Sequence, residues 1–204
     1  MLVNFLGAPC SGKTTIAAMV FAMLKEQGIS CEFIPEQARW HIARKRNGLY
    51  LSPTENLILT NQDQFLIMDN QYEIEETLLT AVKDTAIVIS DSSTLLSLLY
   101  MTPVMIGDPW IQDLMQKSIK RDCLYFYVSP IPASGNLDPN RLHSREQSIA
   151  LDLKLDLVLK EQVPQIYDKI IRLQESSATR TRVAVSAILQ KMFRNANSYS
   201  TDNS

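Results

Sequence analysis

Residues 1–15 read MLVNFLGAPCSGKTT, and their order predicts the architecture of the whole chain. The segment Leu2–Leu6 is apolar throughout and predicts a buried β-strand, while residues 14–27 place apolar side chains at helical spacing. Between them, residues 7–14 (GAPCSGKT) have the pattern G-x-x-x-x-G-K-[ST], whose backbone N–H groups cradle phosphates. The motif stands in the strand–loop–helix context that it requires, so the stretch predicts a loop that binds a nucleoside triphosphate.

The side chains of this loop predict the cofactors ATP and Mg²⁺. The ammonium group of Lys13 is expected to reach the β- and γ-phosphates, and the hydroxyl group of Thr14 is expected to hold Mg²⁺. The residues expected to surround ATP are Gly7, Ala8, Pro9, Cys10, Ser11, Gly12, Lys13, Thr14 and Thr15.

The composition is that of one α/β domain with a good apolar core. Of 204 residues, 46% are hydrophobic and 21% are charged. The formal net charge of −2 is not the electrostatic footprint of a dedicated nucleic-acid-binding protein. Three widely spaced cysteines predict neither a disulfide framework nor a zinc site, which favours a cytoplasmic location. Signal-peptide features and a membrane-spanning apolar run are both lacking, so no membrane association is expected.

Short apolar segments alternate with helical patterns along the chain, which predicts βαβ units and a parallel sheet. The expected strands are 2–6, 31–35, 86–90, 124–128 and 165–173. The expected helices after the first are 36–47, 53–82, 94–101, 113–120, 151–159 and 181–192. The alternation in residues 151–159 (LDLKLDLVL) also fits a half-exposed strand, but Leu151, Leu155, Val158 and Leu159 form one helical stripe, which favours a helix.

These elements predict one domain over residues 1–192. Residues 130–140 (PIPASGNLDPN) are rich in turn-forming residues and predict a loop, which with its flank to about residue 148 is a candidate lid. The polar segment 193–204 predicts a disordered tail.

Two acidic residues follow neighbouring predicted strands and are the leading candidates for chemistry. Asp91 follows the strand 86–90, at the sheet edge where ligands bind, and is a candidate to hold Mg²⁺ or to orient a hydroxyl group. Glu36 follows the strand 31–35 and is a candidate base or substrate ligand, with Arg39 one helical turn beyond it. A helix cap is the structural alternative for Asp91, and a surface ion pair is the alternative for Glu36 and Arg39.

Asp91 is followed by Ser92 rather than by an acid that could activate water, which favours transfer to an acceptor other than water. Arg141 and Arg145 follow the candidate lid loop, where they could stabilise charge on a transferred phosphoryl group; a solvated start of a helix is the alternative.

Amides on the predicted helix 53–82, Gln64 among them, could bind the edge of a base, although an exposed polar face is favoured for Gln62, Asp63, Gln64 and Gln71. The basic residues Arg44, Lys45 and Arg46 form either a solvated face or a track for the phosphates of DNA.

The motifs GAPCSGKTT, PEQARW, ISDSS and LDPNRLHSREQ stand in an order that resembles a group of small P-loop kinases. This group includes the ribosylnicotinamide kinase domain and related bacterial and phage P-loop proteins, and the resemblance spans about residues 2–190. It implies a P-loop NTPase fold with a five-stranded parallel sheet, helices on its faces and a lid. It also implies that Lys13 and Thr14 carry the ATP–Mg²⁺ site, that Glu36 and Arg39 lie near the acceptor, and that Asp91 and Arg141 are the strand-end acid and the lid arginine.

The expected activity is therefore transfer of a phosphoryl group from ATP to a nucleoside- or nucleotide-like small molecule, with Glu36 or Asp91 as the base. Two alternatives stay open, namely a kinase that acts on a hydroxymethylated base in phage DNA and a nucleotide-dependent switch or ATPase without an acceptor. Association with a second copy of the chain is also open.

Overall fold

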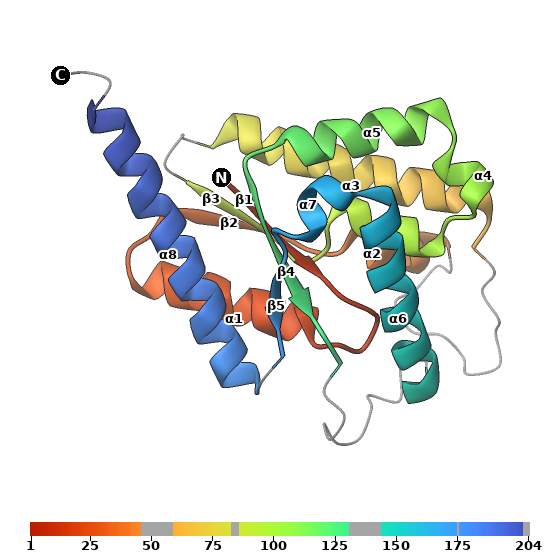
Figure 1. The fold of residues 1–204 in the computed structure, drawn as a ribbon, viewed down its shortest axis with the longest axis horizontal. Helices are drawn as coiled ribbons and strands as arrows, with labels where there is room; N and C mark the ends of the chain where they lie inside the picture. The colour runs from red at the N-terminus through yellow and green to blue at the C-terminus, as the bar shows by residue number, and fades with distance from the viewer. Residues whose placement is uncertain (46–58, 83–85, 131–143, 175, 202–204) are drawn as a thin grey trace.

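The computed structural model describes residues 1–45, 59–82, 86–130, 144–174 and 176–201 of the chain (Figure 1). Its centre is a sheet of five strands in the order β2-β3-β1-β4-β5, and every neighbouring pair is parallel. The strands are β1 (Leu2–Leu6), β2 (Cys31–Ile34), β3 (Ile87–Ser90), β4 (Cys123–Val128) and β5 (Ile171–Leu173). The predicted α/β fold with a five-stranded parallel sheet is confirmed.

Helices connect these strands and cover both faces of the sheet (Figure 1). The helices are α1 (Lys13–Glu26), α2 (Gln37–Lys45), α3 (Asn61–Ala81), the 3₁₀ helix η1 (Thr94–Tyr100), α4 (Pro103–Ile106), α5 (Pro109–Lys120), α6 (Arg145–Gln162), α7 (Pro164–Tyr167) and α8 (Ser177–Thr201). No helix within the described residues combines the length and the apolar character needed to cross a membrane.

The two faces of the sheet bury separate clusters of apolar side chains. Strand β1 is buried at every position, and its side chains alternate between the two faces. Val3 and Phe5 pack with α1 and α8, which lie side by side on one face, while Leu6 packs with η1, α5 and α6 on the other (Figure 1). The phosphate-loop segment therefore leaves from the most protected strand, which holds its first residues in place.

The helix expected over residues 94–101 differs in type, and the one expected over residues 181–192 is much longer in the structure. Residues 94–101 were expected to form a helix, and they form one of the tighter 3₁₀ type, η1. Residues 151–159 form part of α6, which confirms the helix rather than the alternating strand. Helix α8 continues through Thr201, past Asn195, where the polar composition predicts disorder.

The last strand is much shorter than expected, because a helix occupies the first part of the predicted segment. Pro164 begins α7 at its first helical position, which suits the fixed φ of proline, and Val163 precedes it. Strand β5 consequently spans only Ile171–Leu173, so the expectation of a strand over 165–173 is wrong for its first six residues. The lid loop expected near residues 130–140 lies almost entirely outside the described residues.

Candidate active site

The phosphate loop joins β1 to α1 in a backbone conformation that requires glycine. Gly7 has φ +153°, and a Cβ atom on it would lie 2.4 Å from the carbonyl oxygen of Val128 and 2.8 Å from Oγ of Ser11. Gly12 has φ +91° and caps α1 without a side-chain hydrogen bond. The first N–H groups of α1 thus stay available to an anion, as a phosphate-binding helix terminus requires.

Lys13 folds back over this loop. Its Nζ donates to the carbonyl oxygens of Gly7, at 2.8 Å, and Ala8, at 3.1 Å, and its side chain is buried. The loop is held from a second side by Ser148 of α6, whose hydroxyl group donates to the carbonyl oxygen of Pro9. The neighbours Thr14 and Thr15 are exposed at the start of α1.

The register of the sheet places Glu36 and Asp91 next to each other. Ile34 of β2 pairs with Ser90 of β3, and the N–H group of Asp91 donates to the carbonyl oxygen of Ile34 at 3.0 Å. The two chains therefore leave the sheet side by side, and the acids follow the last paired residues by one or two positions.

Asp91 lies at the centre of the candidate site, and only 3% of its surface is exposed. Burial raises the pKa of Asp91 above its ordinary value and the charge of Glu36 raises it further, whereas a hydrogen bond from Thr14 and the charges of Lys13 and Arg39 lower it. Since these groups act on one carboxyl group, the structure brings together five of the residues that the sequence singles out.

The Oδ1 atom of Asp91 is buried without a hydrogen-bond partner among the described residues. A buried carboxylate oxygen of this kind, beside the hydroxyl group of Thr14, fits Mg²⁺, which prefers oxygen ligands and is usually held by one or two protein groups together with substrate phosphates. The described residues contain no cluster of three or more His, Cys, Asp or Glu side chains for a metal, so the fit is to a phosphate-bound ion rather than to a cage of protein ligands.

Tyr100 is a site residue that the sequence analysis did not identify. Burial raises the pKa of its phenol, and the charges of Glu36 and Cys10 raise it further. Tyr100 ends η1, and 39% of its surface is exposed. In the sequence it only closes the apolar run of residues 94–101, and that pattern carries no sign of a site.

Arg180 is the second residue that the sequence analysis missed. Only 2% of its surface is exposed, and its Nη2 atom donates to the carbonyl oxygen of Ser129 at 2.7 Å, while Nη1 donates to that of Ser11 in the phosphate loop at 3.4 Å. Burial lowers the pKa of this guanidinium group, and no described carboxylate contributes to its shift. Arg180 lies four and eight residues before Ala184 and Ile188, on the same buried face of α8. This spacing was the sequence signal that could have identified Arg180, because an arginine on an apolar helix face is costly to bury unless its charge has a role or a partner.

The amides and acids of α3 differ from the expected exposed face. Gln62 is exposed as expected, but Asp63, Gln64 and Gln71 are buried. Asp63 accepts hydrogen bonds from Thr60 and Lys45 and pairs with His41 at 2.9 Å; of these partners, Lys45 does most to hold the pKa of Asp63 well below its usual range. The exposed-face interpretation of these three residues is therefore wrong.

The ion pair between Asp63 and Lys45 involves one of the three basic residues at positions 44–46. Lys45 is held by Asp63, Arg44 is exposed, and Arg46 lies outside the described residues. The lid arginines stay predictions, since Arg141 and the side chain of Arg145 lie outside the described residues as well.

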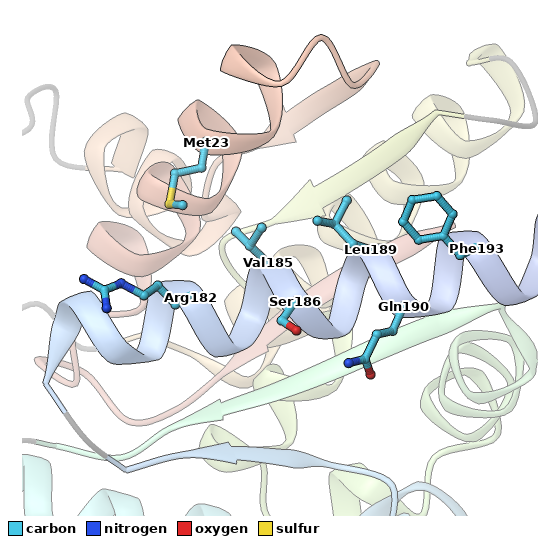
Figure 2. Close-up of a pocket in the computed structure, with 7 residues that line it drawn as sticks. All are labelled: Met23, Arg182, Val185, Ser186, Leu189, Gln190 and Phe193. Atoms are coloured by element: carbon cyan, nitrogen blue, oxygen red, sulfur yellow. The ribbon is translucent and has the colours of Figure 1, made fainter.

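A surface hollow of about 330 Å³ lies between α1 and α8 rather than at the phosphate loop. Figure 2 shows its lining, which is mainly apolar and includes Met23, Val185, Leu189 and Phe193. The candidate site at the carboxyl ends of the strands does not involve this hollow.

Comparison with solved structures supports the fold. A structure of NadR in complex with NAD and AMP-PNP matches with a TM-score of 0.64 and 19% identity, over 93% of this chain and 48% of that one. A structure of NadR in complex with NR matches with a TM-score of 0.66 and 18% identity, over 93% and 50% of the two chains. The likeness is one of fold, and this chain spans about half the length of those proteins.

Comparison of the sequence with protein families agrees with this result. No curated protein matches the chain. One family model, described as an AAA domain, matches residues 2–177. The resemblance to P-loop kinases and their relatives is thus confirmed for the family and the fold. Since the family model covers most of its length, the chain belongs to this AAA domain family.

Proposed function

We propose that this protein transfers the γ-phosphoryl group of ATP to a hydroxyl group of a nucleoside- or nucleotide-like acceptor. The observation that carries the proposal is the pair of carboxylates, Glu36 and Asp91, beside Thr14 and Lys13 of the phosphate loop. A phosphate loop alone would serve any NTPase, whereas a second carboxylate one strand away offers a base for an acceptor hydroxyl group. The complexes of NadR with NR and NAD, in a protein of the same fold, support an acceptor of this class.

We assign each site residue either to ATP or to the acceptor, according to the residues that lie next to it. The loop N–H groups and Lys13 bind the phosphates of ATP, and Thr14 with Asp91 would hold Mg²⁺. When bound, Mg²⁺ neutralises charge on the phosphates and aligns them. We assign Asp91 to the metal side because it follows β3, the strand next to β1, and interacts with Thr14. We assign Glu36 to the acceptor side because it follows β2, one strand farther from the phosphate loop.

In the proposed reaction Glu36 accepts the proton of the acceptor hydroxyl group. The hydroxyl oxygen forms a bond to the γ-phosphorus while the bond to the β–γ bridging oxygen breaks, and ADP leaves. Arg39 contributes positive charge beside the two carboxylates. Arg141 and Arg145 are proposed to close over the transferred group from the lid.

The experiment supplies γ-labelled ATP and Mg²⁺ with a pool of nucleosides, nucleoside monophosphates, nicotinamide riboside, and DNA with and without hydroxymethylated bases. Label on a small molecule supports the proposal and identifies the acceptor. Label on DNA would replace it with modification of nucleic acid, and label only in free phosphate would replace it with hydrolysis.

Once an acceptor is known, the kcat of single-residue variants tests the proposed roles of Lys13 and Glu36. Lys13→Met and Glu36→Gln should each lower kcat by at least about 100-fold, the usual scale for loss of phosphate stabilisation or of a base. Glu73→Gln, which changes an exposed acid of α3, is the matched control and should leave turnover unchanged. Full turnover by Glu36→Gln would remove Glu36 from the mechanism.

A further inference from the structure

Gln71 of α3 connects the backbone N–H group beside Glu36 to the side chain of the serine beside Asp91. Its side chain is 2% exposed, and its Oε1 atom accepts a hydrogen bond of 3.2 Å from the N–H group of Gln37, the residue after Glu36. Its Nε2 atom donates at 3.0 Å to Oγ of Ser90, the residue before Asp91. One amide group therefore contacts the immediate chain neighbours of both candidate carboxylates.

The orientation of this amide is determined by its partners. The N–H group of Gln37 can only donate, so the amide oxygen of Gln71 must face it and the NH₂ group must face Ser90. The same NH₂ group donates to Glu75 at 3.1 Å, which gives its second hydrogen a partner. Gln37 is the first residue of α2, and the first N–H groups of a helix have no hydrogen-bond acceptor within it. The amide oxygen of Gln71 therefore also supplies the N–H group of Gln37 with an acceptor.

Gln71 in turn rests on a buried polar network. Glu75 accepts from the hydroxyl group of Thr94 at 2.9 Å and pairs with Arg121 at 2.8 Å, so it is fixed by η1 and by the segment before β4. Ser90 donates to the carbonyl oxygen of Ser92 at 2.5 Å, which braces the turn that carries Asp91. A satisfied buried network of this kind is rigid, because each lost bond leaves an unpaired polar group.

We propose that Gln71 is a positioning residue that sets the placement of Glu36 relative to Asp91, and thereby aligns the acceptor hydroxyl group with the ATP–Mg²⁺ site. The inference rests on the proposed function. Gln71 acts through Gln37 and Ser90 rather than by touching substrate, so its loss should lower the rate of transfer more than the binding of nucleotide. A misplacement of about 1 Å at such a site can cost about 100-fold in rate.

The test uses Gln71→Met, which keeps the length of the side chain and removes its hydrogen bonds. Ile67→Val, on the buried face of the same helix, is a stability control for a modest packing loss, and Gln62→Met is the exposed-glutamine control. For each folded variant we would measure kcat, the KM for ATP and for the acceptor, and the Kd of a fluorescent ATP analogue. We would also solve crystal structures of the wild type and Gln71→Met.

The expected result is a kcat that falls about 10- to 100-fold in Gln71→Met, with an unchanged Kd for the ATP analogue and a visible displacement of Glu36 relative to Asp91. Ser90→Ala should lower kcat too, and the double variant should lose less than the product of the two single losses, since both act on one contact. A kcat within twofold of the Ile67→Val control, or unmoved carboxylates in the crystal structure, would overturn the inference.

The crystal structures separate this inference from the proposed function. If the wild type transfers phosphate to no acceptor, the proposed function fails. The placement of the two carboxylates in Gln71→Met then still shows whether Gln71 positions them.

Discussion

Arg180 shows how a single buried charge can serve the phosphate loop. Its guanidinium group donates to carbonyl oxygens of Ser11 and Ser129, and no described carboxylate pairs with it. A buried cation without a counterion has lost its hydration, and its pKa is lowered accordingly. An anion in the neighbouring loop would interact favourably with that charge, so Arg180 should favour binding of phosphate.

We therefore predict that Arg180→Met weakens binding of ATP by about 10- to 150-fold, since hydrogen bonds to charged groups are typically worth about 1.5–3 kcal/mol. Isothermal titration with a non-hydrolysable ATP analogue measures the change. Arg182→Met, which removes an exposed arginine from the same helix, should bind as the wild type does. Equal affinities of Arg180→Met and the wild type would contradict an electrostatic role for Arg180.

At the scale of elements, Asp63 joins α2 to α3. It forms a capping box with Thr60 at the start of α3, and it also pairs with Lys45 and His41 of α2. These partners hold the pKa of Asp63 below that of an unfolded chain. The stabilisation of the fold by ionised Asp63 is therefore fully present above the unfolded pKa of about 3.9, and it is lost as the pH falls through the folded-state pKa of Asp63.

Asp63→Asn should lower the free energy of unfolding by about 1–3 kcal/mol at pH 7, the range for charged hydrogen bonds and a helix cap. Urea unfolding at pH 7 and pH 3 measures it, and the difference from the wild type should shrink at the lower pH. Asp69→Asn, at a partly exposed position of the same helix, is the control and should change the stability little. A loss that is the same at both pH values would contradict the electrostatic explanation.

At the level of the whole molecule, the buried ion pair between Arg121 and Glu75 joins α3 to the segment between α5 and β4. Arg121 precedes β4, contacts Glu75 and Glu76 of α3, and stacks on the ring of Tyr72 at 4.0 Å from its centroid. Glu75 is fully buried, and burial raises its pKa despite the charge of Arg121. The fold therefore depends on the pairing of a carboxylate that has no access to solvent.

Arg121→Met should destabilise the protein by about 3–5 kcal/mol near neutral pH, because it leaves a buried charge uncompensated. A carboxyl group whose folded-state pKa is raised stabilises the fold below its unfolded pKa and loses that contribution as the pH rises. The charge of Arg121 lowers the pKa of Glu75, so Arg121→Met should raise that pKa further. The variant should then lose more stability than the wild type as the pH rises, and its deficit in urea unfolding should be larger at pH 8 than at pH 5. Glu76→Gln, which alters only the half-exposed partner of Arg121, should cost about 1 kcal/mol or less.

The features that could be predicted from the amino-acid sequence are the local ones. The phosphate loop is one contiguous motif, and the strands β1, β3 and β4 are short apolar runs whose alternation with helical patterns predicts a parallel sheet. The positions of Glu36 and Asp91 after their strands were also sufficient to predict that they meet, since parallel strands end at one edge.

Which polar side chains are buried, and what they contact, depends on the three-dimensional fold. In the sequence Gln71, Glu75 and Asp63 resemble the polar face of any helix, and the position of Arg180 on an apolar stripe does not show which groups it contacts. Their partners on other elements lie 15 to 169 residues away, and those elements become neighbours only when the sheet is assembled. A periodic pattern reports how polar each residue is, but the burial of a polar group depends on a partner that local sequence does not contain.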